Sequence, residues 1–155
     1  IDNSQDWQRK IKNSLQINYG RAPYWHDFRD ELLSILSEPY QKLVDLNLAV
    51  IFLFLNKLDI KVDWCLSSSL STNLSGSDMI IEICNQLSAT RYFSGKDGKN
   101  YLNEKTFYQN NIKVIYQNFE HPVYSQFHGG FYPSMSIIDL YFNHGPESVK
   151  IIRGV

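Results

Sequence analysis

The chain has 155 residues, and its 15 Lys and Arg against 16 Asp and Glu leave a net charge of −1. This balance, without a basic run, argues against nucleic acid or an anionic membrane surface as the main partner. The longest apolar run, Leu48–Leu55, is less than half of the roughly 20 residues that a membrane-spanning helix needs, so we expect no membrane span. Cys65 and Cys84 form no CxxC pair. With no signal peptide recognisable, we expect reduced thiols and a cytoplasmic location.

Three helices are predicted in the N-terminal third. The first follows Ser4, a suitable N-cap, and ends at Gly20. The second begins around Pro23, a favourable first helical residue. The third spans about residues 40–58 and becomes apolar on all sides from Leu48 to Leu55, which predicts a central, buried helix.

Beyond residue 59 the pattern predicts short strands alternating with helices. The expected strands are Lys61–Leu66, Thr90–Phe93 and Ile112–Phe119. A helix capped by Ser77 or Asp78 runs to Leu87, and a shorter one spans about residues 103–110. Strand, helix and strand joined by short loops are typical of βαβ units. We therefore predict one α/β domain over residues 1–155, a short parallel sheet with βαβ crossovers flanked by helices, and a helical N-terminal third.

Ligands of open parallel sheets bind beyond the carboxyl ends of the strands. Two loops at such predicted ends carry small or basic residues that suit a phosphate, and Gly permits close backbone approach. The substrate-binding candidates in these loops are Ser67, Ser68, Ser69, Ser94, Gly95, Lys96, Lys99 and Tyr101. The bland alternatives are exposed turns and helix caps. No GxSxG, GxGxxG or Walker A sequence occurs, so neither a serine nucleophile nor a dinucleotide or P-loop site is supported.

The stretch from Glu120 to Pro146 contains three of the four histidines and the Gly-Gly pair. Residues 134–143 predict a helix that is apolar almost all round, apart from a narrow stripe formed by Ser136, Asp139 and Asn143. Such a helix is normally buried, and its polar groups must then find hydrogen-bond partners. We expect the stripe to face other polar groups.

The same stretch supplies the catalytic candidates. His121 or His128 would act as a general base, and Asp139 would orient that histidine. The structural alternatives are a strand-end imidazole bonded to a backbone carbonyl, and an aspartate that accepts backbone N–H bonds from the 121–130 loop. The further substrate-binding candidates are Tyr124, Gln126 and Asn143. The histidine spacing matches no known metal-ligand pattern, and the sequence indicates no particular cofactor or oligomeric state.

Several stretches, in their order and spacing, resemble the WbqC-like family of bacterial proteins. They are IDNSQDWQRK (1–10), YGRAPYW (19–25), DLN (45–47), SSSL (67–70), SGKDGKNYL (94–102), HPVY with Gln126 (121–126) and SIIDLYFNHGP (136–146). The resemblance implies a cytoplasmic role in making an activated, amino-bearing sugar for O-antigen or other lipopolysaccharide synthesis. Family members usually carry a further N-terminal segment with a Gln-Pro…Pro-Trp…Gly-Tyr motif, so we expect this chain to be the C-terminal part of one.

The resulting expectation is a transferase acting on a small molecule, a nucleotide-linked amino sugar. One alternative is a non-catalytic protein that binds a ligand or partner in polysaccharide assembly. The other is a nucleotidyltransferase-like enzyme whose phosphate motif belongs to the N-terminal segment.

Overall fold

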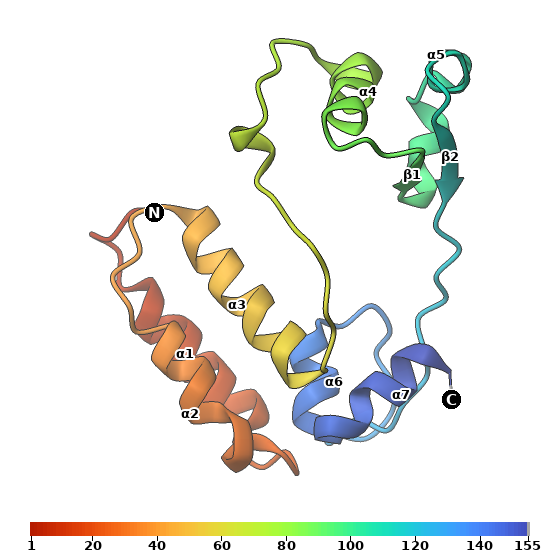
Figure 1. Ribbon diagram of the computed structural model, residues 1–155. Helices are drawn as coiled ribbons and strands as arrows, with labels where there is room; N and C mark the ends of the chain where they lie inside the picture. The colour runs from red at the N-terminus through yellow and green to blue at the C-terminus, as the bar shows by residue number, and fades with distance from the viewer. Residues whose placement is uncertain (155) are drawn as a thin grey trace. The chain divides into compact units, whose positions relative to one another are not determined.

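The structure, a computed structural model, describes residues 1–154 and forms two compact units (Figure 1). Unit 1 comprises residues 1–62 and 121–154, and unit 2 comprises Asp63–Glu120. Helices with a small parallel sheet confirm the mixed α/β class. The single domain over residues 1–155 stays a prediction, and each unit is described by itself.

Unit 1 is helical. Its elements are α1 (Trp7–Tyr19), α2 (Trp25–Ile35), α3 (Leu43–Lys57), α6 (Ile137–His144), the 3-10 turn η3 (Gly145–Glu147) and α7 (Ser148–Arg153). The three helices predicted in the N-terminal third are therefore confirmed, and two of their starts are corrected.

The first correction concerns Ser4, which is not the N-cap of α1. Its amide and hydroxyl both bond to Oδ1 of Asp2, at 3.0 and 2.6 Å. Asp6 precedes the helix instead. The second correction concerns α2, which begins at Trp25 rather than at Pro23. The residues before it connect with α6, because the Tyr24 amide donates to the carbonyl of Phe142 at 3.0 Å.

An aromatic cluster joins α6 to the N-terminal helices. Phe142 is fully buried, and its ring lies 5.0 Å from Trp25 and 5.1 Å from Tyr19 between centroids. Tyr141 lies 4.6 Å from Phe28, which in turn contacts Phe54 of α3. Tilted rings at these separations are a favourable aromatic arrangement. The predicted burial of the 134–143 helix is confirmed, although the helix itself starts at Ile137.

Gly145 closes α6 with a φ of 53°. A Cβ at this position would collide with the ring of Tyr24. Glycine is required here both for the left-handed backbone and for the close approach.

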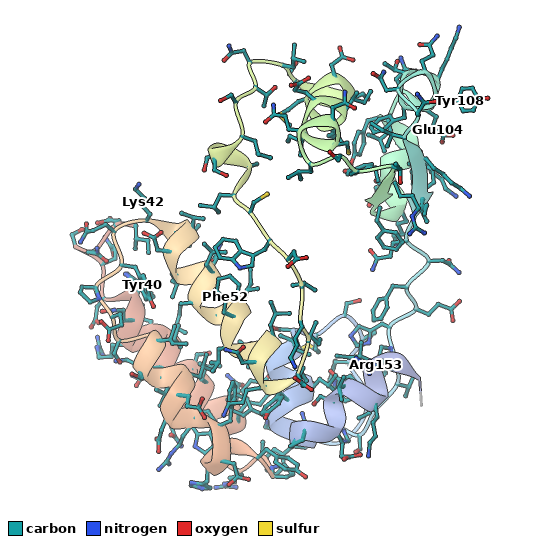
Figure 2. All side chains as sticks on the ribbon, viewed as in Figure 1. Tyr40, Lys42, Phe52, Glu104, Tyr108 and Arg153 are labelled. Carbon is teal, nitrogen blue, oxygen red and sulfur yellow. The ribbon has the colours of Figure 1, made fainter. Side chains whose placement is uncertain are left out.

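The third helix is less buried than its sequence predicts. Leu43, Val44 and Ile51 of α3 are 59%, 41% and 50% exposed. Phe52, next to Ile51, is half-buried (Figure 2). Only Leu46 and Phe54 of α3 are buried. The prediction of a helix buried on all sides was wrong, because α2 and α6 cover only part of its surface.

Unit 2 contains the sheet. Its elements are η1 (Ser67–Ser69), α4 (Gly76–Gln86), β1 (Arg91–Ser94), η2 (Lys96–Asn100), α5 (Glu104–Gln109) and β2 (Lys113–Tyr116). The strands are parallel, with Arg91 opposite Lys113 and Ser94 opposite Tyr116 (Figure 1). This confirms the second and third predicted strands and the helical crossover between them. The cap of α4 is Ser75 rather than Ser77 or Asp78.

The first predicted strand, Lys61–Leu66, does not form. Val62 and Trp64 are 56% and 57% exposed, and the segment has no strand beside it. A short alternating sequence pairs only where a neighbouring strand offers its edge. Ser67–Ser69 is consequently not a strand end but an exposed 3-10 turn.

The core of unit 2 is small. Phe107 and Ile112 pack with Ile81 and Cys84 of α4, and Tyr92 stacks on Phe107 at 5.6 Å. Within residues 1–154, no helix combines the length and the apolar character needed to cross a bilayer.

Candidate functional site

The polar stripe of α6 centres on a buried carboxylate. Asp139 is 6% exposed, and its Oδ1 accepts a hydrogen bond from the Tyr19 hydroxyl at 3.0 Å. Its Oδ2 accepts from the Tyr124 hydroxyl at 2.8 Å and from Nε2 of Gln126 at 3.1 Å. Asp139 therefore faces polar groups, as predicted for the stripe, but its donors are side chains rather than the backbone N–H groups expected from the 121–130 loop.

Asp139 has neutral partners only. Among residues 1–154 it forms no ion pair with a lysine or arginine. Burial raises the pKa of the Tyr124 hydroxyl to about 12, and the carboxylate adds to that rise. Burial first, and then Asp139, also raises the pKa of Tyr19. A buried carboxylate held by neutral donors keeps its negative field uncompensated, and a cation would be attracted to it.

Asn143 and Gln126 fix the loop that precedes α6. Oδ1 of Asn143 accepts from the Phe127 amide at 2.7 Å, and its Nδ2 donates to the Asp139 carbonyl at 2.8 Å. The Gln126 side chain pairs with the backbone of Tyr132, donating at 2.9 Å and accepting at 2.7 Å. These bonds hold residues 126–132 as an ordered loop beside α6.

Each histidine of this region donates to a backbone carbonyl. His128 donates from Nε2 to Asn18 of α1 at 2.6 Å, and His144 from Nε2 to Ser125 at 2.9 Å. His121 donates from Nδ1 to the carbonyl of Pro122 at 3.0 Å, although it lies in the loop after β2, which ends at Tyr116, and not at a strand end. The orienting partner of His128 is thus a carbonyl of α1, and orientation of a histidine by Asp139 stays a prediction.

A cavity of about 580 Å³ lies between α1, the 126–135 loop and α6. It is lined by Ser14, Asn18, Tyr19, Gln126, Phe127, His128, Tyr132, Met135, Asp139 and Asn143. Four of the predicted site residues (Gln126, His128, Asp139, Asn143) are among them. The lining combines aromatic rings, amides, an imidazole and a carboxylate, which suits a polar ring-shaped ligand.

The residues from α1 were missed by sequence reasoning. Asn18 and Tyr19 were not among the predicted site residues, although both line the cavity. A tyrosine at the end of an apolar helix face weakly indicates a buried polar site, because its hydroxyl needs a polar partner when the ring is buried. The identity of that partner depends on tertiary packing.

His121 and Tyr124 belong to unit 1 but do not line this cavity, and the other predicted site residues belong to unit 2. Ser67, Ser68 and Ser69 form the exposed turn η1. Ser94 is buried and donates to the Gly95 carbonyl at 3.1 Å, so its hydroxyl serves packing. A Cβ on Gly98 would collide with that hydroxyl, so the turn is tightly packed.

The basic residues of that loop are arranged differently. Lys99 lies over the Tyr116 ring at 5.2 Å, and Tyr101 is 66% exposed. Lys96 lines a hollow of about 310 Å³ at the carboxyl ends of the two strands, together with Gly95, Asp97, Gln117 and Phe119. Phosphate binding there stays a prediction.

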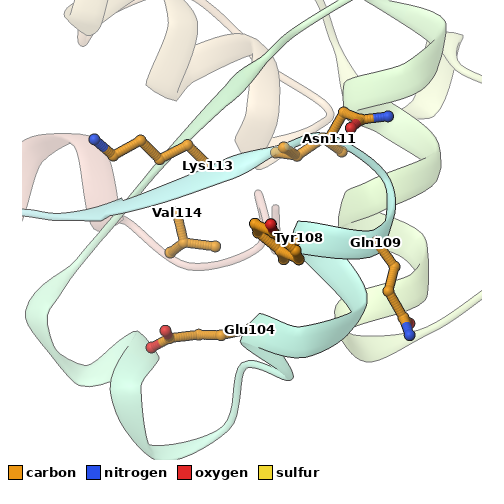
Figure 3. A pocket seen from close by; sticks show the side chains of 7 residues that line it. Glu104, Tyr108, Gln109, Asn111, Lys113 and Val114 are labelled. Carbon is orange, nitrogen blue, oxygen red and sulfur yellow. The ribbon is translucent and has the colours of Figure 1, made fainter.

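A larger hollow of about 760 Å³ lies between α5 and β2 (Figure 3). Glu104, Tyr108 and Gln109 contribute from α5, and residues 111–114 from the strand side. No predicted site residue lines it. In the part of the chain that the structure describes, no group of three His, Cys, Asp or Glu side chains is placed to hold a metal ion.

Comparison with known proteins gives a family and one curated relative. The model of the WbqC-like protein family matches residues 1–151. The uncharacterised protein Rv1507c of Mycobacterium tuberculosis is 29% identical over 150 residues, which are 96% of this chain. The chain spans 65% of the length of that relative. No solved structure gives a significant match.

Proposed function

Since the chain belongs to the WbqC-like protein family, we propose that it acts in bacterial surface-polysaccharide synthesis, in the cytoplasm, as a transferase on a nucleotide-linked amino sugar. The observation that carries the proposal is that His128 and Asp139 line the same cavity of unit 1. One offers an imidazole and the other an uncompensated carboxylate, which are the groups that binding and deprotonating an amine require.

The buried carboxylate of Asp139 is the reason for proposing a substrate with an amino group. An ammonium placed beside Asp139 would supply the positive charge that residues 1–154 do not provide. The rings of Tyr19, Phe127 and Tyr132 offer faces for a sugar ring, and the amides of Asn18 and Asn143 offer donors and acceptors for its hydroxyl groups.

His128 is the proposed general base. Because Nε2 carries the hydrogen donated to Asn18, Nδ1 holds the lone pair in the neutral ring. For amide formation, the ammonium bound at Asp139 must first lose one proton to solvent, which frees the lone pair of the nitrogen. As this neutral amine bonds to the acyl carbon of a donor, Nδ1 would take its second proton, and the donor's leaving group would depart with the electrons of the broken bond. His128 is preferred to His121 because it lines the cavity. A carbonyl that fixes the tautomer makes the free nitrogen a competent base.

Turnover tests this assignment. A panel of nucleotide-linked amino sugars with acyl and aminoacyl donors would be assayed with wild type, H128A, D139N and the control H26A, which removes an exposed histidine of α2. H128A should reduce kcat by at least about 100-fold, the usual share of a general base. D139N should mainly raise KM for the amino sugar. Wild-type kcat/KM in H128A would contradict the assignment of the base.

A second candidate is a non-catalytic binding protein of the same assembly pathway. It is favoured by the three histidines that donate to backbone carbonyls, since these bonds by themselves stabilise the loop. This candidate predicts saturable binding of an amino sugar that depends on Asp139, with no product formed from any donor.

A further inference from the structure

A second cavity adjoins the first on the surface of unit 1. It measures about 650 Å³ and is lined by Gln16, Ile17, Gly20, Arg21, Phe127 and His128. Phe127 and His128 line both cavities, so the two are neighbours along the C-terminal half of α1. The charged group of the first is Asp139, and the charged group of the second is Arg21.

Among the described residues, the Arg21 guanidinium forms no ion pair. Arg9 pairs with Asp6 and Arg29 with Asp30, whereas Arg21 forms no ion pair with any residue from 1 to 154. Its side chain is exposed and borders the second cavity.

The end of α1 does not need this cation as a cap. The carbonyl of Gln16 accepts the Gly20 amide at 2.9 Å, and that of Tyr19 accepts the Ala22 amide at 2.8 Å. The Asn18 carbonyl accepts from His128. With these carbonyls satisfied within the protein, the guanidinium donors can serve a ligand.

Gly20 leaves room for the side-chain amide of Gln16, which lines the same cavity. A Cβ at Gly20 would collide with Nε2 and the backbone carbonyl of Gln16, so only glycine allows the Gln16 side chain to lie there. The cavity therefore has a planar guanidinium and a neutral side-chain amide in its lining, and phosphate oxygens accept from both kinds of group.

We propose that the Arg21 cavity binds the phosphate or diphosphate group of the ligand whose amine lies at Asp139. The inference rests on the proposed function and deepens it. Opposite charges in adjoining cavities would fix the direction of a ligand that is cationic at one end and anionic at the other. It also places the anion within unit 1, the unit that carries Asp139, rather than on the Ser67–Ser69 or Ser94–Lys99 loops of unit 2.

Two simple probes test the two cavities separately. Inorganic pyrophosphate, without metal, reports on Arg21, and glucosamine reports on Asp139; both would be titrated by calorimetry at low salt. R21Q should weaken pyrophosphate binding by about 10-fold or more and leave glucosamine binding unchanged, because a charge-assisted bidentate contact is lost. R21K should fall between, since lysine keeps the charge without the fork. D139N should weaken glucosamine binding alone.

The control is K10Q, an exposed lysine on α1 outside both cavities, and K96Q tests the rival phosphate site predicted in the loop of unit 2. Both should bind pyrophosphate as wild type does. The inference would be overturned if R21Q bound pyrophosphate as wild type does, or if K96Q lost the binding instead. It would also be overturned if wild type did not bind pyrophosphate at millimolar concentrations. A lower Tm of R21Q with unchanged binding would do the same, since Arg21 would then act only on the α1 dipole. Glucosamine binding that does not depend on Asp139 would instead count against the proposed function.

Discussion

Replacing Asp139 with alanine removes the acceptor of three hydrogen bonds at once, those from Tyr19, Tyr124 and Gln126. Each hydrogen bond to a charged group contributes about 1.5–3 kcal/mol, which gives roughly 5–9 kcal/mol before offsets. The alanine variant no longer has to bury a charged carboxylate, and avoiding this desolvation cost offsets several kcal/mol of that loss. The buried Tyr124 hydroxyl is left without its partner. We expect a net loss of about 3 kcal/mol in the free energy of unfolding.

The assay is denaturant unfolding followed by far-UV circular dichroism, with a thermal scan beside it. A loss of this size should lower Tm by roughly 6–12 °C in a chain of this length. Asp139→Asn keeps one oxygen acceptor and the shape, and should lose only about 1 kcal/mol. Asp63→Ala, at an exposed aspartate outside the helices and strands, is the matched control and should stay near wild type.

A double-mutant cycle isolates the hydrogen bond itself. Tyr124→Phe combined with Asp139→Ala should show a coupling energy of about 1–3 kcal/mol. An Asp139→Ala protein within about 0.5 kcal/mol of wild type, or a cycle without coupling, would refute the assignment of Asp139 as the acceptor that secures the loop.

Three further predictions concern the same unit. Asn143→Leu removes the acceptor of the Phe127 amide, so hydrogen exchange at that amide should accelerate about 10-fold or more, and unchanged exchange would contradict the contact. Gly145→Ala forces a Cβ against Tyr24 at positive φ and should lower the free energy of unfolding by about 1–3 kcal/mol in urea titrations, whereas a neutral effect would mean the turn relaxes. Because the pKa of Tyr124 is raised to about 12 when folded and lies near 10 when unfolded, its stabilisation should be complete below pH 10 and be lost as the pH rises toward 12. The raised pKa of Tyr19 contributes a loss in the same direction, so Tyr124→Phe should reduce the slope of the stability profile above pH 10 without abolishing it.

The fold was predictable where one pattern repeated over several turns. The buried helix around Asp139 was recognisable because its polar positions are spaced i, i+3 and i+7 in an otherwise apolar segment. The strands predicted at Thr90–Phe93 and Ile112–Phe119 were found; the first is shifted by one residue to Arg91–Ser94, and the second is shorter at both ends, Lys113–Tyr116. Lys61–Leu66 has a comparable local pattern, and it fails as a strand because pairing is a property of the neighbour as well as the segment.

The candidate site was predictable only along the α6 region. Gln126, Asp139 and Asn143 are close in sequence to their loop, so their joint role follows from local geometry. Tyr19 donates to Asp139 across a sequence separation of 120 residues, which no spacing rule can anticipate. The Ser94–Lys99 loop was grouped with these residues on the assumption of one sheet with three strand ends, of which only two strands form.

The discontinuity of unit 1 bears on how the chain folds as it is synthesised. Residues 1–62 emerge before unit 2, but their aromatic core lacks Tyr141 and Phe142 until the whole of unit 2 has been synthesised. Unit 2 is contiguous and has its own small core, so it can fold before residues 121–154 are synthesised. During this time Trp25 and Phe28 lack their contacts with the aromatic rings of α6. Contacts of such long sequence separation are slow to form, and chaperone demand should peak in this interval.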